Sequence, residues 1–262
     1  MNAEGARRKP AVRLSLFRAR RVGAALLLAA LALPALPSTG AAEPPADAAV
    51  LDAFAKIALG NEFAAEPDPR LKKWTQPVRW RSYAELPLEG GERDFLDRHL
   101  ERLRRLTGLD FAEAGRWPET NFAILFVRED RFEYWIDRYI EPSRRSMLAR
   151  LARSACLGFL RHHRVTFEIE FAVAIIPVER ARARGLMQSC IAEETTQVLG
   201  LLNDVDMPGT LFNDTGKPRD LTPLDELLVR LLYHPGLRPG MRRGEALAAA
   251  RRALPALRGG AR

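Results

Sequence analysis

The stretch Cys190–Asp204 (CIAEETTQVLGLLND) constrains the fold more than any other part of the chain. Spaced at 100° per residue, apolar side chains form one helical stripe: Met187, Ile191, Val198, Leu201 and Leu202. Glu194 falls near the middle of this stripe, where a carboxylate is costly unless another group compensates its charge. Gly200 then interrupts the helix. The pattern predicts a core helix that ends in a bend and carries polar groups there.

The net charge of +8 is concentrated at the front of the chain. Residues 1–42 hold seven basic residues and one acid, and the remainder is nearly neutral. DNA or RNA binding therefore has little support, and no nucleic-acid partner is expected.

The same front segment has the pattern of a targeting peptide. A basic region precedes VGAALLLAALALPALP, and small residues follow through Ala41–Ala42. We expect residues 1–42 to be a signal peptide, with an uncleaved anchor as the alternative, because the apolar run is short and broken by prolines. The protein is expected to be exported, either periplasmic or secreted, with membrane contact only through this segment if it stays uncleaved.

Cys156 and Cys190 are the two cysteines of the chain. In an oxidising compartment they predict one disulfide. The alternative is a nucleophilic Cys190 paired with His162 or His163, but the neighbouring acids Glu193 and Glu194 would raise the pKa of its thiol.

Periodicity along the rest of the chain predicts an α+β fold. The expected helices are Val50–Leu59, Glu92–Leu106, Ser143–Ala155 and Glu245–Leu257, with another capped by Thr222 and opened by Pro223. The expected strands lie within PVRWRSY after Trp74, at Asn121–Val127 and at Val165–Val178.

The order of these elements resembles the core of the metzincin proteases. In that family a helix with HExxHxxGxxH/D bends at its glycine, a tight methionine turn follows, and a helix opening LSPDD closes the domain. EETTQVLGLLND, TLFND and LTPLDELLVRLLY resemble these parts in order. The resemblance implies a small mixed twisted sheet with a central bent helix and C-terminal helices over residues 74–241. Residues 43–73 would be a leader with a short helix, and residues 242–262 a C-terminal helix and tail.

The chain is also similar to an uncharacterised bacterial family, the domain of unknown function numbered 2927. The shared features are a leading cysteine, EExxQxLGLxND, and a late LTxxDxxLLxxLY followed by GM at Gly240–Met241. This second resemblance implies no established activity.

The departures from the metzincin pattern concern its chemistry. Glu193, Gln197 and Asn203 occupy the positions of the metal ligands, Glu194 that of the general base, and Phe212 that of the methionine. Because amide oxygens are poor zinc donors, neither zinc nor another cofactor is expected. A weak Ca²⁺ or Mg²⁺ site remains an alternative.

Three hypotheses follow. In the first, the chain is a binding or structural module and not an enzyme. Its polar network would stabilise the bend and recognise an extracytoplasmic protein, a peptide or a cell-wall component; this network is Glu193, Glu194, Gln197, Asn203 and Asp204. In the second, it is a zinc-independent hydrolase with Glu194 as general base and Gln197 or Asn203 orienting water or substrate. In the third, it is a weak metal-binding, peptidase-like enzyme.

Overall fold

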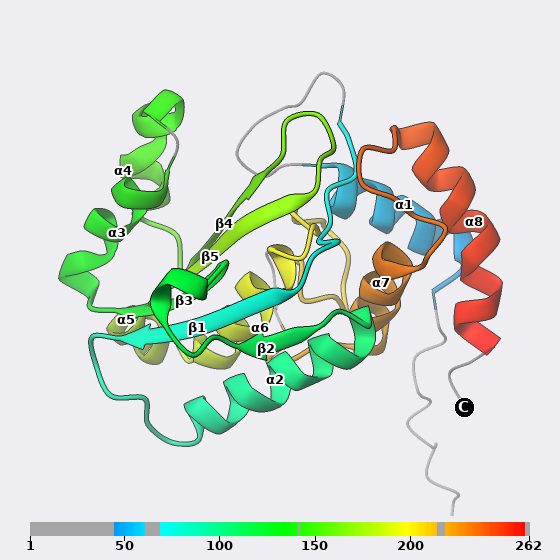
Figure 1. Ribbon diagram of the computed structural model, residues 1–262. Coiled ribbons are helices and arrows are strands. Elements are labelled where there is room, and N and C mark those ends of the chain that lie inside the picture. The colour runs from blue at the N-terminus through cyan, green and yellow to red at the C-terminus, as the bar shows by residue number, and fades with distance from the viewer. Residues whose placement is uncertain (1–44, 61–68, 141, 214–217, 260–262) are drawn as a thin grey trace, which may run out of the picture. The chain divides into compact units, whose positions relative to one another are not determined.

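The computed structural model describes residues 45–60, 69–140, 142–213 and 218–259. The expected targeting peptide, residues 1–42, lies outside these ranges, as does Asp214 of the TLFND turn. Pro44–Arg262 form one compact unit, which is the part described below (Figure 1).

The described part of this unit contains eight α-helices and one sheet of five strands. The strands are β1 (Val78–Ala84), β2 (Phe111–Glu113), β3 (Phe122–Val127), β4 (Leu157–His162) and β5 (Ile169–Pro177). The helices are α1 (Asp47–Leu59), α2 (Glu92–Thr107), α3 (Phe132–Tyr139), α4 (Leu148–Leu151), α5 (Val178–Ala183), α6 (Met187–Gln197), α7 (Pro223–Tyr233) and α8 (Arg243–Gly259).

The sheet is mixed, with the strand order β2-β1-β3-β5-β4. The first four of these strands are parallel, and β4 runs antiparallel to β5 at the edge. In the central pairing Ile124 of β3 lies opposite Ser82 of β1 and Ala174 of β5. A mixed sheet packed with helices is consistent with the predicted α+β class.

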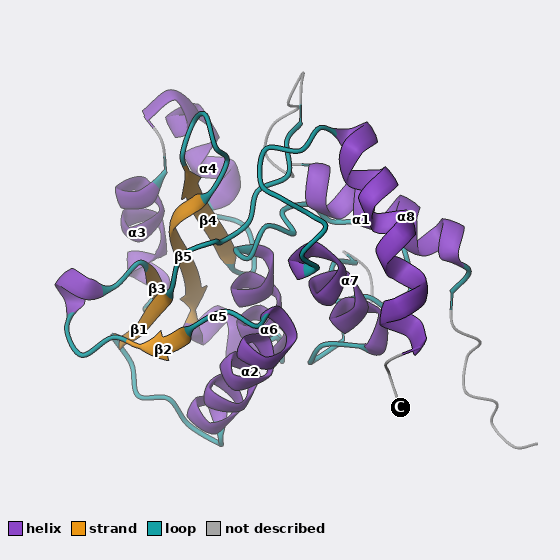
Figure 2. Ribbon diagram, turned by 45° about the vertical axis from the view of Figure 1, so that its right-hand side comes forward, coloured by secondary structure: helices purple, strands orange, loops and turns teal. Residues whose placement is uncertain are grey.

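Both faces of the sheet are covered. In β3, alternate residues point to opposite faces: Phe122, Ile124 and Phe126 join one core cluster, and Ala123, Leu125 and Val127 join another. Figure 2 shows α3 and α4 on one side of the sheet and α2 and α6 on the other. Because both faces are buried, β3 is apolar throughout, as the sequence predicted.

Helix α1 belongs to the same core as the sheet and the late helices. Its Val50, Phe54 and Ile57 are fully buried, and the helix contacts α7 and α8. At its start, Asp47 forms an ion pair with Arg258 of α8 at 2.8 Å. Residues from both ends of the described chain therefore share one core.

Two predicted elements differ in the structure, and one strand was not predicted. The helix expected at Ser143–Ala155 is a 3₁₀ segment, Pro142–Met147, followed by the single turn α4. The strand expected from Val165 begins only at Ile169, because Phe167 has a positive φ of 62° in the preceding turn. That turn joins β5 to β4, a strand that the sequence pattern did not indicate.

Candidate functional site

Helix α6, which carries the predicted polar residues, lies inside the core. It contacts β4 and β5 on the sheet side and α2 on the other, and every residue from Ser189 to Gln197 is buried. Thr195 and Thr196 tolerate this burial because their hydroxyls donate to the carbonyl oxygens of Ile191 and Ala192, each at 2.6 Å. The helix is thus enclosed well beyond the single apolar stripe that its sequence predicted.

Glu193 and Glu194 lie beside a disulfide. Glu193 is only 3% exposed and Glu194 only 5%. Cys156, just before β4, is bonded to Cys190 of α6, as predicted from the cysteine count. One oxygen of each carboxylate and the Sγ of Cys156 lie within 4.8 Å of one another. The acids are therefore held in the interior between α6 and the sheet edge.

A glycine on β4 permits this close approach. A Cβ added to Gly158 would lie 2.9 Å from Oε2 of Glu194 and 3.1 Å from Cγ1 of Val198. Any larger residue there would have to displace the carboxylate or the strand. Gly158 is thus a site residue that the sequence analysis did not identify.

The predicted bend after α6 is present. The helix ends at Gln197, whose carbonyl accepts from the N–H groups of Gly200 and Leu201 at 2.9 and 3.0 Å. Gly200 has φ of 116°, and a Cβ there would lie 2.1 Å from the carbonyl oxygen of Lys72. Only glycine combines this φ with so close a backbone neighbour.

The amides around the bend have contacts of their own. Gln197 donates from Nε2 to Oδ1 of Asp204 at 3.0 Å. Asn203 donates from Nδ2 to the carbonyl of Asp204, also at 3.0 Å, and its side chain lies against Gly60 at the end of α1. Gln197 and Asn203 thus both bond to Asp204, and the Asn203 side chain is directed toward α1.

Side chains from distant segments satisfy the carbonyls that the bend leaves open. Trp74 donates from Nε1 to the carbonyl of Val198 at 3.0 Å, and Tyr233 donates to that of Leu199 at 2.9 Å. Next to Trp74, Lys73 donates instead to carbonyls at and beyond the end of α7, those of Leu232 and Leu237, each at 3.0 Å, and burial lowers its pKa to about 8. The bend is a fixed part of the core.

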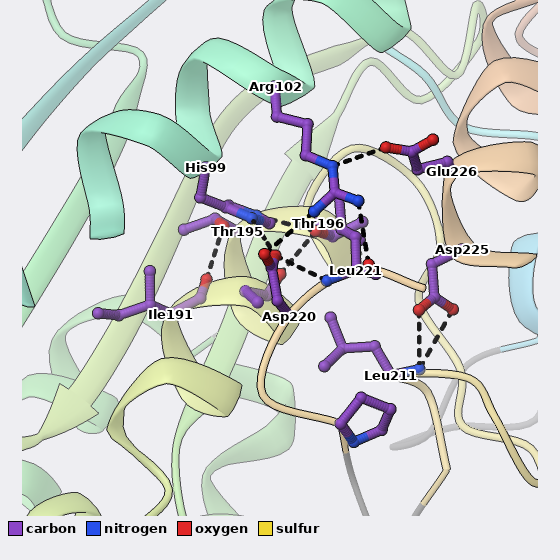
Figure 3. A network of polar contacts seen from close by, with 12 residues as sticks. His99, Arg102, Ile191, Thr195, Thr196, Leu211, Asp220, Leu221, Asp225 and Glu226 are labelled. Atoms are coloured by element: carbon purple, nitrogen blue, oxygen red, sulfur yellow. Dashed lines mark hydrogen bonds and ion pairs between the residues drawn. The ribbon is translucent and has the colours of Figure 1, made fainter. Parts of the chain in front are cut away.

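A buried histidine that the sequence analysis did not consider lies on the far side of α6. His99 of α2 is 2% exposed, with Nε2 3.3 Å from Oγ1 of Thr196 and Nδ1 3.6 Å from Oδ1 of Asp220 (Figure 3). Desolvation by burial lowers the pKa of His99, although the neighbouring Asp220 opposes the shift. The imidazole is therefore held in its neutral form near pH 7.

The Thr196–His99–Asp220 arrangement has the residue types of a hydrolase triad but not its geometry. The Thr196 hydroxyl directs its proton to the carbonyl of Ala192 at 2.6 Å and not to the imidazole, which would have to accept it to activate a nucleophile. Thr196 is also fully buried, so no substrate can reach it. The arrangement is structural.

The same network ties α2 to the start of α7 (Figure 3). Arg102 forms ion pairs with Asp220 at 3.1 Å and with Glu226 at 2.6 Å. Asp225 accepts from the backbone N–H of Leu211 and from both the N–H and hydroxyl of Thr222. The Thr222 cap is thus confirmed, and its partner Asp225 also holds the turn that contains Phe212.

The other three histidines of the chain, all within the described residues, do not join Glu193 and Glu194 in a possible metal-ligand cluster. His163 accepts through Nδ1 from the N–H groups of Val165 and Thr166, and His234 accepts from that of Gly236. His162 stacks on Phe167 in the same turn as His163. Within the described residues, no histidine joins a potential metal-ligand cluster; the one such cluster is Cys156, Glu193 and Glu194.

A cavity of about 320 Å³ lies between α2 and the sheet strands β1 and β2. Its wall includes Arg93, whose guanidinium stacks over Trp80 and pairs with Asp97 at 2.9 Å. None of the predicted site residues lines it.

The fold and this site define an α+β protein with two buried acids beside a disulfide, on a central helix that ends in a turn at Gly200. A family model described as a protein of unknown function, DUF2927, matches residues 47–252, and the chain belongs to this family. No curated protein and no solved structure matches the chain.

None of the helices in the described ranges is long and apolar enough to cross a membrane. The Cys156–Cys190 disulfide is compatible with an extracytoplasmic protein.

Proposed function

We propose that this chain is an exported, non-catalytic module built on a metzincin-like scaffold that carries no imidazole ligands. Its partner would be an extracytoplasmic protein, a peptide or a cell-wall component. The observation that carries this proposal is the burial of the acid pair. A general base must reach water and substrate, whereas Glu193 and Glu194 are almost completely enclosed.

The order of the elements supports the metzincin-like part of the proposal. A helix at the sheet turns at a glycine, a tight turn follows at Thr210–Phe212, and a helix capped by Thr222 closes the core. The residues at the ligand positions do not suit zinc, because Gln197 uses its amide as a donor to Asp204 and Asn203 is directed toward α1. No step of a metal-dependent hydrolysis is assigned to them.

A comparison of Glu194→Gln with the exposed control Glu170→Gln tests the non-catalytic role. Both variants and the oxidised full chain are assayed for cleavage of denatured protein and of a mixed peptide library. We expect no turnover above background in any of them, and a lower unfolding midpoint for Glu194→Gln alone. Turnover in the wild type that is lost in a folded Glu194→Gln chain would establish the hydrolase alternative.

Export is tested separately, by N-terminal sequencing of the chain recovered from the extracytoplasmic fraction of the expressing cell. We expect a mature end near Ala42. Recovery of the intact N-terminus in the soluble cytoplasmic fraction would contradict export.

A further inference from the structure

The acid pair and Cys156 bring three possible metal ligands to one place, and Cys190 adjoins them through its disulfide with Cys156. Cys190, Glu193 and Glu194 are spaced i, i+3 and i+4, so they share one face of α6. Cys156 reaches the same face from the sheet edge, and its Sγ lies within 4.8 Å of both carboxylates. The fourth group, Sγ of Cys190, is bonded directly to Sγ of Cys156.

In the oxidised chain the sulfurs are not ligands, because a metal binds the thiolate and not a disulfide. We propose that reduction of Cys156–Cys190 converts this cluster into a Zn²⁺ site formed by Cys156, Cys190, Glu193 and Glu194. The site differs from the ligand positions of the metzincin motif, since it uses the sheet-edge cysteine and neither Gln197 nor Asn203.

The redox step is a thiol–disulfide exchange with a dithiol reductant. The S–S bond of Cys156–Cys190 accepts two electrons and two protons, and the dithiol becomes a disulfide. Binding of Zn²⁺ then releases the protons of the two cysteine thiols as the thiolates coordinate the metal.

The geometry suits a small tetrahedral ion. Zinc–sulfur and zinc–oxygen distances of about 2.3 and 2.0 Å place the ligands about 3.5 Å apart. The two carboxylates and Sγ of Cys156 would therefore move closer together, whereas the two sulfurs, bonded in the disulfide, would move apart after reduction. The dication would also compensate the charge of carboxylates in an interior where charge is costly. The reductant and the metal would reach the cluster from the edge of the sheet, because β4 is an edge strand and Arg153, in the turn before Cys156, is exposed.

The test compares the full chain in its oxidised form and after reduction with a phosphine, which binds zinc weakly. Zinc is added, excess metal is removed, and bound metal is measured by elemental analysis. Co²⁺ replaces zinc in a parallel experiment, since thiolate ligation gives charge-transfer bands and a tetrahedral site gives intense visible bands. We expect about one zinc per reduced chain and none per oxidised chain.

Variants separate this site from adventitious binding. Glu193→Gln together with Glu194→Gln should weaken zinc binding by the reduced chain at least about 10- to 100-fold, whereas Glu170→Gln should not. Unchanged affinity in the double variant overturns the proposal, because two thiols alone would then explain the binding. A Co²⁺ spectrum without thiolate bands overturns it as well.

Folding is followed throughout by near-ultraviolet circular dichroism. If reduction loosens the fold, zinc should restore the native spectrum. A reduced chain that neither binds zinc nor recovers that spectrum overturns the proposal. These outcomes do not depend on the non-catalytic role, which is measured on the oxidised chain.

Discussion

The imidazole of His99 makes the stability of the protein depend on pH. Its pKa is lowered by burial from the ordinary value of 6.5, so the unfolded chain takes up a proton at a higher pH than the folded chain. We predict that the free energy of unfolding is fully maintained above pH 6.5 and falls as the pH drops below it, by at most about 1.4 kcal/mol per pH unit from this group. Urea denaturation from pH 7.5 to 5 measures this slope.

A His99→Gln variant should show a shallower slope over the same pH range, because it lacks the buried imidazole. A His99→Gln chain with an unchanged slope would show that other groups cause the acid sensitivity.

At the scale of residues, the sequence predicted the acids but not their surroundings. Glu194 on an apolar stripe indicated a buried carboxylate, and it is buried. His99 could not be placed beside Thr196, because 97 residues separate them and an isolated histidine on a helix has no local signal for its partner. Gly158 was missed for the same reason: its importance depends on a helix that follows much later in the chain.

At the scale of elements, the turn after α6 requires a glycine. Replacing Gly200 with alanine places a Cβ at 2.1 Å from the Lys72 carbonyl in a backbone conformation that disfavours side chains. We predict a loss of about 2–5 kcal/mol for Gly200→Ala. Gly244→Ala is the matched control, because a Cβ there meets nothing within 4 Å, and it should change stability by less than about 1 kcal/mol. Thermal unfolding of the two variants distinguishes these cases, and equal melting temperatures would contradict the assigned role.

The disulfide stabilises the contact between α6 and β4. It closes a loop with a sequence separation of 34, for which the chain-entropy model gives about 3–4 kcal/mol. Cys156→Ser with Cys190→Ser should therefore lower the free energy of unfolding by about that amount in metal-free buffer. Denaturant titration of the double variant against the oxidised wild type measures it, and a difference below about 1 kcal/mol would show that the link contributes little.

Elements with strong local signals were predicted well. A glycine stands directly before α2 and another directly after it, as expected. A wholly apolar run forms β3, and α7 starts with a complete capping box at Thr222–Pro223. The segment from residue 142 to β4 was predicted poorly. It is rich in arginine and forms only short turns, whose conformation depends on packing against the sheet and not on periodicity.

At the scale of the whole molecule, α1 is part of the domain core. A chain beginning at residue 44 should unfold cooperatively, whereas one beginning at residue 61 should lose the native near-ultraviolet signal and aggregate. The second chain lacks Val50, Phe54 and Ile57, and their partners on α7 and α8 become exposed. Circular dichroism and size-exclusion chromatography check this, and a monomeric, cooperatively folded second chain would contradict it.

The pairing of α1 with α8 also determines when the structure can be completed during synthesis. Arg258 donates a hydrogen bond to the carbonyl of Pro45 across a separation of 213 residues. A polypeptide that emerges from a ribosome or a translocation pore from its amino end therefore exposes the apolar side of α1 until α8 has emerged as well. During that interval a chaperone can bind the exposed apolar side chains of α1. Packing of α8 against α1 then completes the core.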